Sequence, residues 1–369
     1  MIGATRDLAS LARDAVRALP LYAPESADGA LDLSDSVNAW GAPPAALRAL
    51  AEPSAASVSR YPSPRSESLV PALLRYLGLE STGDVRIVTG CGSDDVLDAA
   101  MRAFGSPGDR IAFSSPTFSM IPLFARLNGL EPVPVPFAGT FDLDAERLVD
   151  AGAKITYLCA PNNPTATPVS RAAVEFVATR ASGIVVLDEA YAEFAPESYA
   201  DLVGRCERLL VVRTFSKAFG LAGLRVGYAA GTASVVNMVE RARGPYKVSV
   251  LGERAAHAAL ADADDALGWV RRHARLAVEI RERVATALTT IGLAPLPSAA
   301  NFLCIPASNA SVLAAQLRAR NVLVRCFTGL PREPRALADA QGSALRVGMA
   351  SWDAMQRFLD TLAEVRACE

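Results

Sequence analysis

The 369-residue sequence is poor in histidine, with only His257 and His273. Neither residue has near it in the sequence the partners that a zinc site or a Ser-His-Asp hydrolase triad requires. The six cysteines include no Cys-x-x-Cys pair, and several lie in apolar runs, so we expect reduced, buried thiols. The chemistry must therefore rest on Lys, Asp, Tyr and Arg side chains.

The sequence also lacks long apolar runs and blocks of like charge. No stretch of 18 apolar residues occurs, and Arg6, Asp7, Arg13 and Asp14 lie where a signal peptide would be apolar. The net charge is −2, and the charged residues are spread along the chain. We therefore expect a cytoplasmic protein that binds neither membrane nor nucleic acid, with small molecules or copies of itself as partners.

Two domains are expected from the length and from the order of the segments. A chain of 369 residues, 51% of them hydrophobic, exceeds what one core usually supports. Short apolar runs alternate with helical patterns through the middle of the chain, which predicts a mostly parallel sheet with helices on both faces. These runs are 110–113, 132–135, 155–159, 183–187, 209–212 and 225–228.

The pattern changes in the last third of the chain. It is helical as far as about residue 290, and then strand-like runs follow at 301–305, 322–325 and 344–347. An amphipathic helix separates the first two runs, and a last helix begins at Trp352. This order predicts a smaller α+β domain.

The segment 214–227 carries the most specific chemical signal. It follows the apolar run 209–213, so its first residues should lie at the carboxyl end of a buried strand, where parallel sheets bind ligands. Lys217 is placed to be partly desolvated, which favours the neutral, nucleophilic amine that a Schiff base needs. A surface lysine near a salt-bridged arginine would explain an isolated Ser-Lys pair, but not the whole segment. Side chains suited to a phosphate lie in the same segment: Thr214, Ser216 and Arg225.

Other reactive side chains follow neighbouring strand-like runs. Asp188 ends the run 184–187, where an unpaired carboxylate would be costly but one facing a pyridine nitrogen would keep that nitrogen protonated. Tyr191 and Asn163 can hydrogen-bond a phenolic oxygen, and Phe118 can stack on a ring. Taken singly, each residue is better explained as a capping Asp, a core aromatic or a turn Asn. Their joint occurrence at successive strand ends favours a cofactor site.

A glycine turn within the segment 86–97 precedes a predicted helix. We expect Ser93 or Asp94 as its N-cap, and the free N–H groups at its start as an anion site. Gly90 and Gly92 resemble the opening of a dinucleotide fingerprint, but the third glycine is missing. A nicotinamide-dependent enzyme is therefore disfavoured. A cofactor-binding regulatory protein is also disfavoured, because the chain has no room for a DNA-binding module.

Several motifs together carry a family resemblance. They are Ala18-Leu-Pro-Leu-Tyr22, Arg60-Tyr-Pro62, Gly92-Ser-Asp94, Pro116-Thr-Phe118, Pro161-Asn-Asn-Pro-Thr165, Asp188-Glu-Ala-Tyr191, the segment 213–228 and Leu345-Arg-Val-Gly348. With them the sequence resembles the histidinol-phosphate aminotransferase branch of the class I/II, fold-type I aminotransferases that depend on pyridoxal 5'-phosphate (PLP). The resemblance spans nearly the full length.

The resemblance implies a fold, an assembly and a reaction. The fold is a three-layer α/β/α PLP-transferase, with a large PLP-binding domain at 46–250 and a small α+β domain formed by 1–45 and 251–369. The assembly is a homodimer with shared active sites. The reaction is amino transfer between L-histidinol phosphate and 2-oxoglutarate, a step of histidine biosynthesis.

The resemblance also implies the roles of the site residues. Lys217 would form the Schiff base and shuttle a proton, Asp188 would pair with the pyridinium, and Tyr191 would bind the phenolic oxygen. The cofactor-binding set is Tyr61 from the second subunit, Ser93, Asp94, Phe118, Asn163, Asp188, Tyr191, Thr214, Ser216, Lys217 and Arg225. The substrate-binding set is Tyr22, Asn38, Asn163, Arg325 and Arg346, and no metal is implied.

Three departures from the family pattern affect substrate recognition. Val37 lies in Ser36-Val-Asn-Ala39, where the family usually has a glutamate in Asn-Glu-Asn-Pro, and Ala166 lies where it has a glycine. The stretch between Arg325 and Arg346, which includes 331–335, is longer and more basic than the family pattern. The substrate is therefore less firmly predicted than the reaction type. An aromatic amino acid aminotransferase and a threonine-phosphate decarboxylase of the same family remain alternatives.

Overall fold

The computed structural model describes residues 8–19, 21, 29–51, 58–137, 139 and 141–367 of the chain. Its centre is a seven-stranded sheet in the order β2-β8-β7-β6-β5-β3-β4. The strands are β2 (Val85–Cys91), β3 (Arg110–Ser115), β4 (Glu131–Pro136), β5 (Ile155–Cys159), β6 (Ile184–Asp188), β7 (Leu209–Thr214) and β8 (Val226–Thr232). The mostly parallel sheet expected from the sequence is thus confirmed.

Strand β8 runs antiparallel to both of its neighbours, β2 and β7. The sequence pattern did not reveal this direction. The connection from β7 to β8 is only residues 215–225, which is too short for the crossover that a parallel neighbour requires. The chain therefore turns back on itself directly after the lysine segment.

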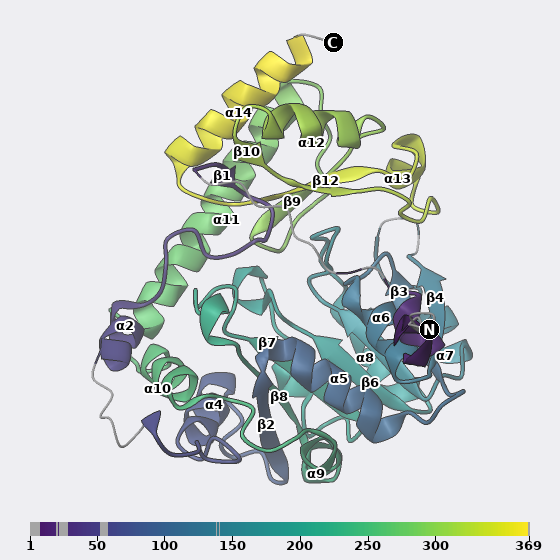
Figure 1. Cartoon of the computed structure of the whole chain (residues 1–369), viewed down its shortest axis with the longest axis vertical. Coiled ribbons are helices and arrows are strands. Elements are labelled where there is room, and N and C mark those ends of the chain that lie inside the picture. The colour runs from purple at the N-terminus through teal and green to yellow at the C-terminus, as the bar shows by residue number, and fades with distance from the viewer. Residues whose placement is uncertain are drawn as a thin grey trace, which may run out of the picture.

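Both faces of the large sheet are buried, as the uninterrupted apolar strands predict. Successive strand side chains point to opposite faces, so Val186 packs into one hydrophobic cluster while Val185 and Leu187 pack into the other. The first cluster includes residues of helices α5 (Gly92–Phe104), α6 (Met120–Leu127) and α9 (Ala233–Ala242). The second includes residues of α4 (Leu69–Leu77), α7 (Ala145–Asp150), α8 (Arg171–Arg180) and α10 (Val250–Ala259). Three layers result (Figure 1).

Two smaller sheets lie above the large sheet in Figure 1. An antiparallel sheet has the order β11-β12-β9, and β1 pairs in parallel with β10. The strands are β1 (Leu31–Asp32), β9 (Phe302–Pro306), β10 (Val322–Leu323), β11 (Arg325–Phe327) and β12 (Ala344–Gly348). The β1–β10 pairing shows that an amino-terminal segment joins the carboxyl-terminal strands.

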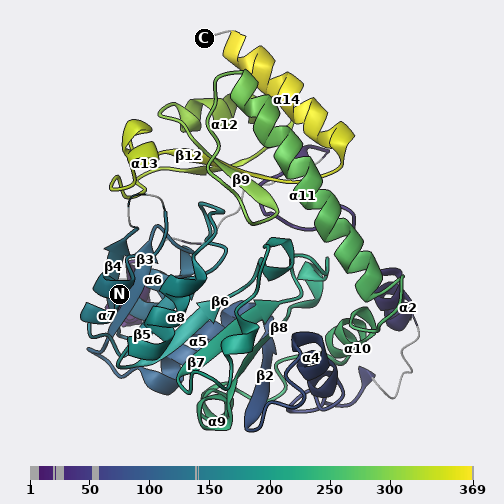
Figure 2. The same cartoon turned by 180° about the vertical axis from the view of Figure 1, so that it is seen from behind.

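Helices flank these small sheets and connect them to the rest of the chain. The 24-residue α11 (Leu267–Thr290) runs from beside α10 to the far end of the molecule, where it lies along α14 (Figure 2). The remaining elements are α1 (Asp14–Arg17), α2 (Pro44–Ala51), α12 (Ala310–Arg318), α13 (Arg335–Asp339), α14 (Trp352–Ala367) and the 3-10 turns η1 (Leu8–Leu11), η2 (Ala192–Phe194), η3 (Ala200–Leu202) and η4 (Ala222–Leu224). Among the described helices, none has the length and apolar character needed to cross a membrane.

Candidate active site

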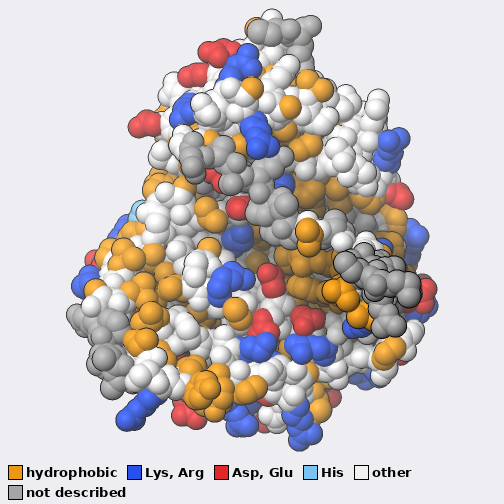
Figure 3. All heavy atoms as spheres, viewed as in Figure 1, with side chains coloured by type: hydrophobic (Ala, Val, Ile, Leu, Met, Phe, Trp, Pro, Cys, Tyr) orange, Lys and Arg blue, Asp and Glu red, His pale blue; other side chains and the backbone are white. Residues whose placement is uncertain are grey.

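A cavity of about 750 Å³ opens between the large sheet and the small antiparallel sheet. Ligand sites commonly have this size. Its walls come from the ends of β5, β6 and β7, from the start of α5, from β11 and β12, and from the segment at Asp35 and Val37. Figure 3, which shows the molecule from the same side as Figure 1, has acidic and basic side chains close together near its middle. The cavity therefore collects the carboxyl ends of the strands, as the sequence predicted.

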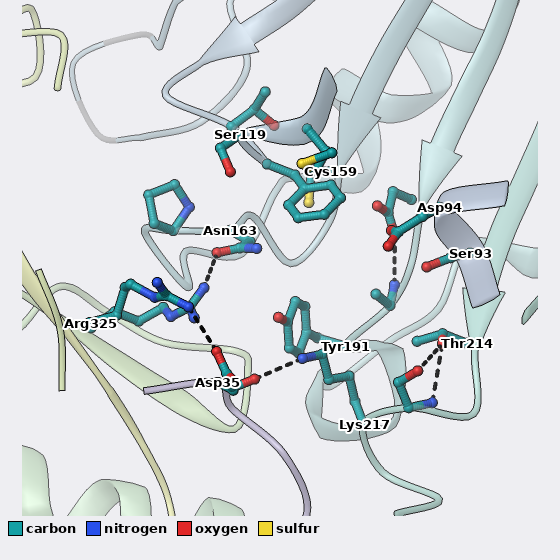
Figure 4. A pocket seen from close by; sticks show the side chains of 18 of the residues that line it. Asp35, Ser93, Asp94, Ser119, Cys159, Asn163, Tyr191, Thr214, Lys217 and Arg325 are labelled. Atoms are coloured by element: carbon teal, nitrogen blue, oxygen red, sulfur yellow. Dashed lines mark hydrogen bonds and ion pairs between the residues drawn. The ribbon is translucent and has the colours of Figure 1, made fainter. Parts of the chain in front are cut away.

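Lys217 projects into this cavity just after β7 ends at Thr214 (Figure 4). Its Nζ donates a hydrogen bond to the backbone oxygen of Asp35 at 2.9 Å and lies 5.6 Å from the ring centre of Tyr191. Burial, followed by the positive charge of Arg346, lowers the pKa of Lys217 to about 8. Lys217 thus holds a much larger neutral fraction near neutral pH than an ordinary lysine.

Asp188 is the last residue of β6 and is only 4% exposed. Burial raises the pKa of Asp188 to about 6. Two donors fix its carboxylate: the Tyr157 hydroxyl at 2.8 Å on Oδ2 and the Ala190 N–H at 3.0 Å on Oδ1. Sequence reasoning missed Tyr157, although its place on β5, two residues before the cavity residue Cys159, puts both side chains on one sheet face.

The start of α5 lies against β8. The helix begins at Gly92 with Cys91 as its N-cap, so the prediction of Ser93 or Asp94 was wrong by two to three residues. The physical reason is that the β2–β8 ladder continues through Cys91↔Val226 and the Gly92 N–H donates to Arg225 O at 3.0 Å. The polypeptide thus passes from strand to helix without an intervening turn.

Two glycines make room for this junction. A Cβ on Gly227 would lie 2.2 Å from Gly92 C and Ser93 N, and a Cβ on Gly92 would lie 2.5 Å from Arg225 Nη2. Arg225 itself adopts a left-handed conformation at φ 52 and donates to Ser216 Oγ at 3.4 Å. The helix start, Arg225 and the hydroxyls after β7 therefore converge into one cradle.

This cradle has the donors that an anion requires. Thr214 Oγ1 donates to Ser216 Oγ at 2.9 Å, and the Arg225 guanidinium lies 3.7 Å from Asp94. The first N–H groups of α5 add the positive end of the helix dipole. Burial raises the pKa of Asp94, and the positive charges of Arg225 and Lys217 lower it.

Two arginines line the opposite wall. Arg346 on β12 and Arg325 on β11 are register partners across the antiparallel pair, so their side chains lie on one face. Arg346 is 8% exposed, and donates to Asn163 Oδ1 at 2.8 Å and to Ser34 O at 2.6 Å. Its Nε is buried and has no hydrogen-bond partner among the described residues. Arg325 forms an ion pair with Asp35 at 2.8 Å.

The rest of the wall is largely apolar. Phe118, Tyr191 and Asn163 all line the cavity, as predicted. Sequence reasoning did not single out Met120, Phe327 or Asp35; neither their type nor their position marks them until the fold brings three segments together. The other lining residues that it missed are Thr117, Ser119, Cys159, Pro164, Ala190, Ala222 and Cys326.

Two predicted residues do not line this cavity, and a third lies outside the described residues. Asn38 donates through Nδ2 to Ala218 O at 2.8 Å and accepts from Trp40 N, so its amide supports the lysine segment from outside the cavity. Tyr61 is 80% exposed and stacks on Tyr246 at 4.7 Å between ring centres. Tyr22 lies outside the described residues. No metal-binding cluster of His, Cys, Asp and Glu occurs among the described residues.

The fold has three layers, and it places a lysine, Lys217, and a buried carboxylate, Asp188, at the ends of two adjacent strands. This combination is typical of PLP-dependent transferases of fold type I. Residues 29–362 match the family model for aminotransferase class I and II. The chain belongs to this family of aminotransferases, whose cofactor is PLP.

Named relatives narrow the comparison. The histidinol-phosphate aminotransferase of Roseiflexus castenholzii is 43% identical over 310 residues, 80% of this chain and 81% of that protein. The histidinol-phosphate aminotransferase of Desulfitobacterium hafniense is 32% identical over 363 residues, 96% of each chain. The crystal structure of histidinol-phosphate aminotransferase from Sinorhizobium meliloti, in complex with PLP, superposes with a TM-score of 0.81 at 27% identity, covering 92% of each chain. The resemblance and the fold class are thus confirmed.

Proposed function

We propose that this enzyme transfers an amino group between L-histidinol phosphate and 2-oxoglutarate, a step of histidine biosynthesis. The observation that carries the proposal is the pair of arginines, Arg325 and Arg346, in the cavity that also holds Lys217. Both substrates bring anions, a phosphate in one case and carboxylates in the other, and either fits a guanidinium fork. Relatives named for this reaction, at up to 43% identity over most of the chain, support the choice.

The residues present fit PLP. When bound, this cofactor supplies a carbonyl carbon for an amine and a pyridinium ring that accepts electrons. The cradle formed by Ser93, Asp94, Thr214, Ser216 and Arg225 would hold its phosphate through hydroxyls, a guanidinium and helix N–H groups. The close approach of Gly227 to Gly92 is what leaves space for these donors to converge.

Three residues would handle the ring and the proton. Lys217 supplies the amine, and its lowered pKa keeps a share of it neutral and able to take up and return a proton at the substrate carbon. Asp188, whose carboxyl has a pKa raised to about 6 by burial, would hold a proton on the ring nitrogen. Tyr191 and Asn163, which line the cavity, would hydrogen-bond the phenolic oxygen, and Phe118 would cover the ring face.

The aromatic alternative rests on a specific observation. Val37, Phe118 and Phe327 give the cavity an apolar wall, and Val37 is 42% exposed and carries no acceptor for an imidazole N–H. An unpaired buried donor costs about 1–3 kcal/mol, which is roughly a tenfold to hundredfold loss in kcat/KM. We therefore expect transfer from histidinol phosphate, with aromatic amino acids as competing donors.

The deciding experiment compares kcat/KM for histidinol phosphate, phenylalanine and threonine phosphate, and also measures release of carbon dioxide. Val37→Glu is the control, because it restores a carboxylate at that position. We expect histidinol phosphate to be the preferred donor. If phenylalanine is preferred by more than tenfold, and Val37→Glu does not shift the ratio, the aromatic assignment replaces this one.

We also propose a homodimer in the cytoplasm, with the large domain at 46–250 and the small domain at 1–45 and 251–369. Tyr61 supports the dimer, because its ring is 80% exposed in one chain and stands on a proline-rich loop. In the dimer its hydroxyl would reach the phosphate cradle of the second subunit. Mixing Tyr61→Phe with Lys217→Ala should form heterodimers with one intact site and recover activity. Sedimentation of an active monomer would contradict the proposal.

A further inference from the structure

A single short segment contacts three of the cations that line the cavity: Lys217, Arg325 and Arg346. The Ser34 oxygen accepts from Arg346 Nη2 at 2.6 Å, and the Asp35 oxygen accepts from Lys217 Nζ at 2.9 Å. The Asp35 carboxylate accepts from Arg325 Nη2 at 2.8 Å (Figure 4). Of these contacts, only the last brings a formal negative charge. The acceptors for Arg346 are neutral oxygens of Ser34 and Asn163.

The two arginines repel one another, and Asp35 offsets this repulsion. Like charges directly opposite each other on antiparallel strands are destabilising. Burial is the largest cause that lowers the pKa of Arg346. Tyr191 raises this pKa, the positive charge of Arg325 lowers it, and the negative charge of Asp35 raises it. Among the described residues, Asp35 is the only carboxylate ion-paired with either arginine. The pair is partly open to the cavity, with side-chain exposures of 25% for Arg325 and 48% for Asp35.

We propose that Asp35 is a specificity-determining residue that serves as a built-in anion for Arg325. The inference rests on the proposed function, in which one cavity binds both the amino donor and the 2-oxo acid. A donor whose distal group is a neutral ring leaves the Asp35–Arg325 ion pair intact. Arg325 then keeps the Asp35 carboxylate as its anionic partner. A substrate with a distal carboxylate exchanges that carboxylate for Asp35, which turns toward solvent.

The ion pair therefore sets the balance between the two kinds of substrate. An exchange of one carboxylate for another gains little, so Asp35 weakens the binding of glutamate and 2-oxoglutarate. The same carboxylate favours a ring, because it removes the cost of an unpaired guanidinium beside an apolar group. The site can then accept dicarboxylates without excluding donors that carry one anion.

The test uses Asp35→Asn, which keeps the shape and an acceptor oxygen but removes the charge. Asp339→Asn is the matched control: Asp339 is also paired with an arginine, Arg335, but both are exposed on α13 outside the cavity. The readouts are the first half-reaction with glutamate and with phenylalanine, and calorimetric binding of succinate and 3-phenylpropionate. A partly exposed pair contributes up to about 1 kcal/mol, so Asp35→Asn should tighten glutamate and succinate about fivefold.

Phenylalanine and 3-phenylpropionate should change less than twofold or bind more weakly, and the control should change none of the four. In an Arg325→Gln background, Asp35→Asn should lose its effect on the glutamate-to-phenylalanine ratio. Weaker glutamate binding, or equal changes for both ligand types, would overturn the proposal. Failure of the proposed function would instead show as no transfer from histidinol phosphate in the parent enzyme. In that case succinate binding would still report on Asp35.

Discussion

Tyr157 and Asp188 form a buried hydrogen bond of 2.8 Å between neighbouring strands of the large sheet. Tyr157 lies on β5 and Asp188 ends β6, and Cys159 is the register partner of Asp188. Because the hydroxyl donates, it favours the ionised form of the carboxylate, but burial dominates and the pKa of Asp188 is raised to about 6. Burial of this carboxylate in the sheet therefore lowers the stability of the cofactor-free enzyme when Asp188 is ionised.

Asp188→Asn should separate function from stability. A neutral amide cannot keep the ring nitrogen protonated, so kcat should fall by several orders of magnitude while the fold persists. The cofactor-free variant should be more stable than the parent above pH 6. A carboxyl whose folded pKa is raised from 3.8 to about 6 loses stability as pH rises through that range, by up to about 3 kcal/mol.

Thermal unfolding of both cofactor-free proteins from pH 4 to pH 8 checks this prediction. The difference in Tm should be largest at pH 8 and should shrink toward pH 4, where Asp188 is protonated in the parent. A variant with nearly unchanged kcat would show that Asp188 acts only structurally.

Lys217 should give cofactor binding a midpoint near pH 8. Only the neutral amine bonds to the carbonyl carbon, so the rate of PLP uptake by the cofactor-free enzyme should rise about tenfold per pH unit below pH 8 and level off above it. Stopped-flow absorbance measures this rate. Arg346→Gln removes a positive charge that lowers the pKa of Lys217, so its midpoint should move upward. An unchanged midpoint in that variant would exclude Arg346 as a cause.

Lys217→Ala should abolish turnover and the yellow colour expected of the purified enzyme, because among the described residues no other lysine lines the cavity. The sequence contains three lysines, Lys154, Lys217 and Lys247, so borohydride reduction followed by peptide mapping identifies the attachment site directly. Lys154→Ala is the control and should keep both colour and activity. Transamination by the Lys217→Ala variant at the parent rate would refute the mechanism.

Gly227→Ala should weaken PLP binding at least tenfold. The added methyl would lie 2.2 Å from backbone atoms of Gly92 and Ser93, so the start of α5 must shift away from the phosphate cradle. Gly223→Ala is a matched control in the same segment, since its Cβ would meet nothing within 4 Å. Equilibrium dialysis of PLP with both variants provides the measurement. Equal affinities would show that the junction tolerates a side chain.

Much of the architecture could be predicted from local patterns. The apolar runs gave the strands of the large sheet, and the rule that ligands bind at carboxyl ends brought together Asn163, Asp188, Tyr191 and Lys217. These inferences succeed because strand burial and strand-end placement depend on residues close in sequence. The same is true of the desolvation of Lys217, which follows from its position after a buried strand.

The remainder depends on contacts between distant segments. Asp35 meets Arg325 across 290 positions, and Asn38 supports Ala218 across 180, so no local pattern reveals either role. The start of α5 was misplaced because a capping rule reads only side chains, whereas here the strand ladder with β8 determines where the helix begins. Tyr61 and the dimer also stay predictions, since they concern a second chain.

The position of the cradle in the sequence, before the two arginines of the opposite wall, has a consequence for the order in which the enzyme is made. Arg225 and Gly227 come from the turn into β8, whereas Arg325 and Arg346 lie about a hundred residues further on. During synthesis the chain emerges from its amino end. The ribosome therefore delivers every residue proposed to hold the phosphate before Arg325 or Arg346, the arginines proposed to bind the substrate, exists.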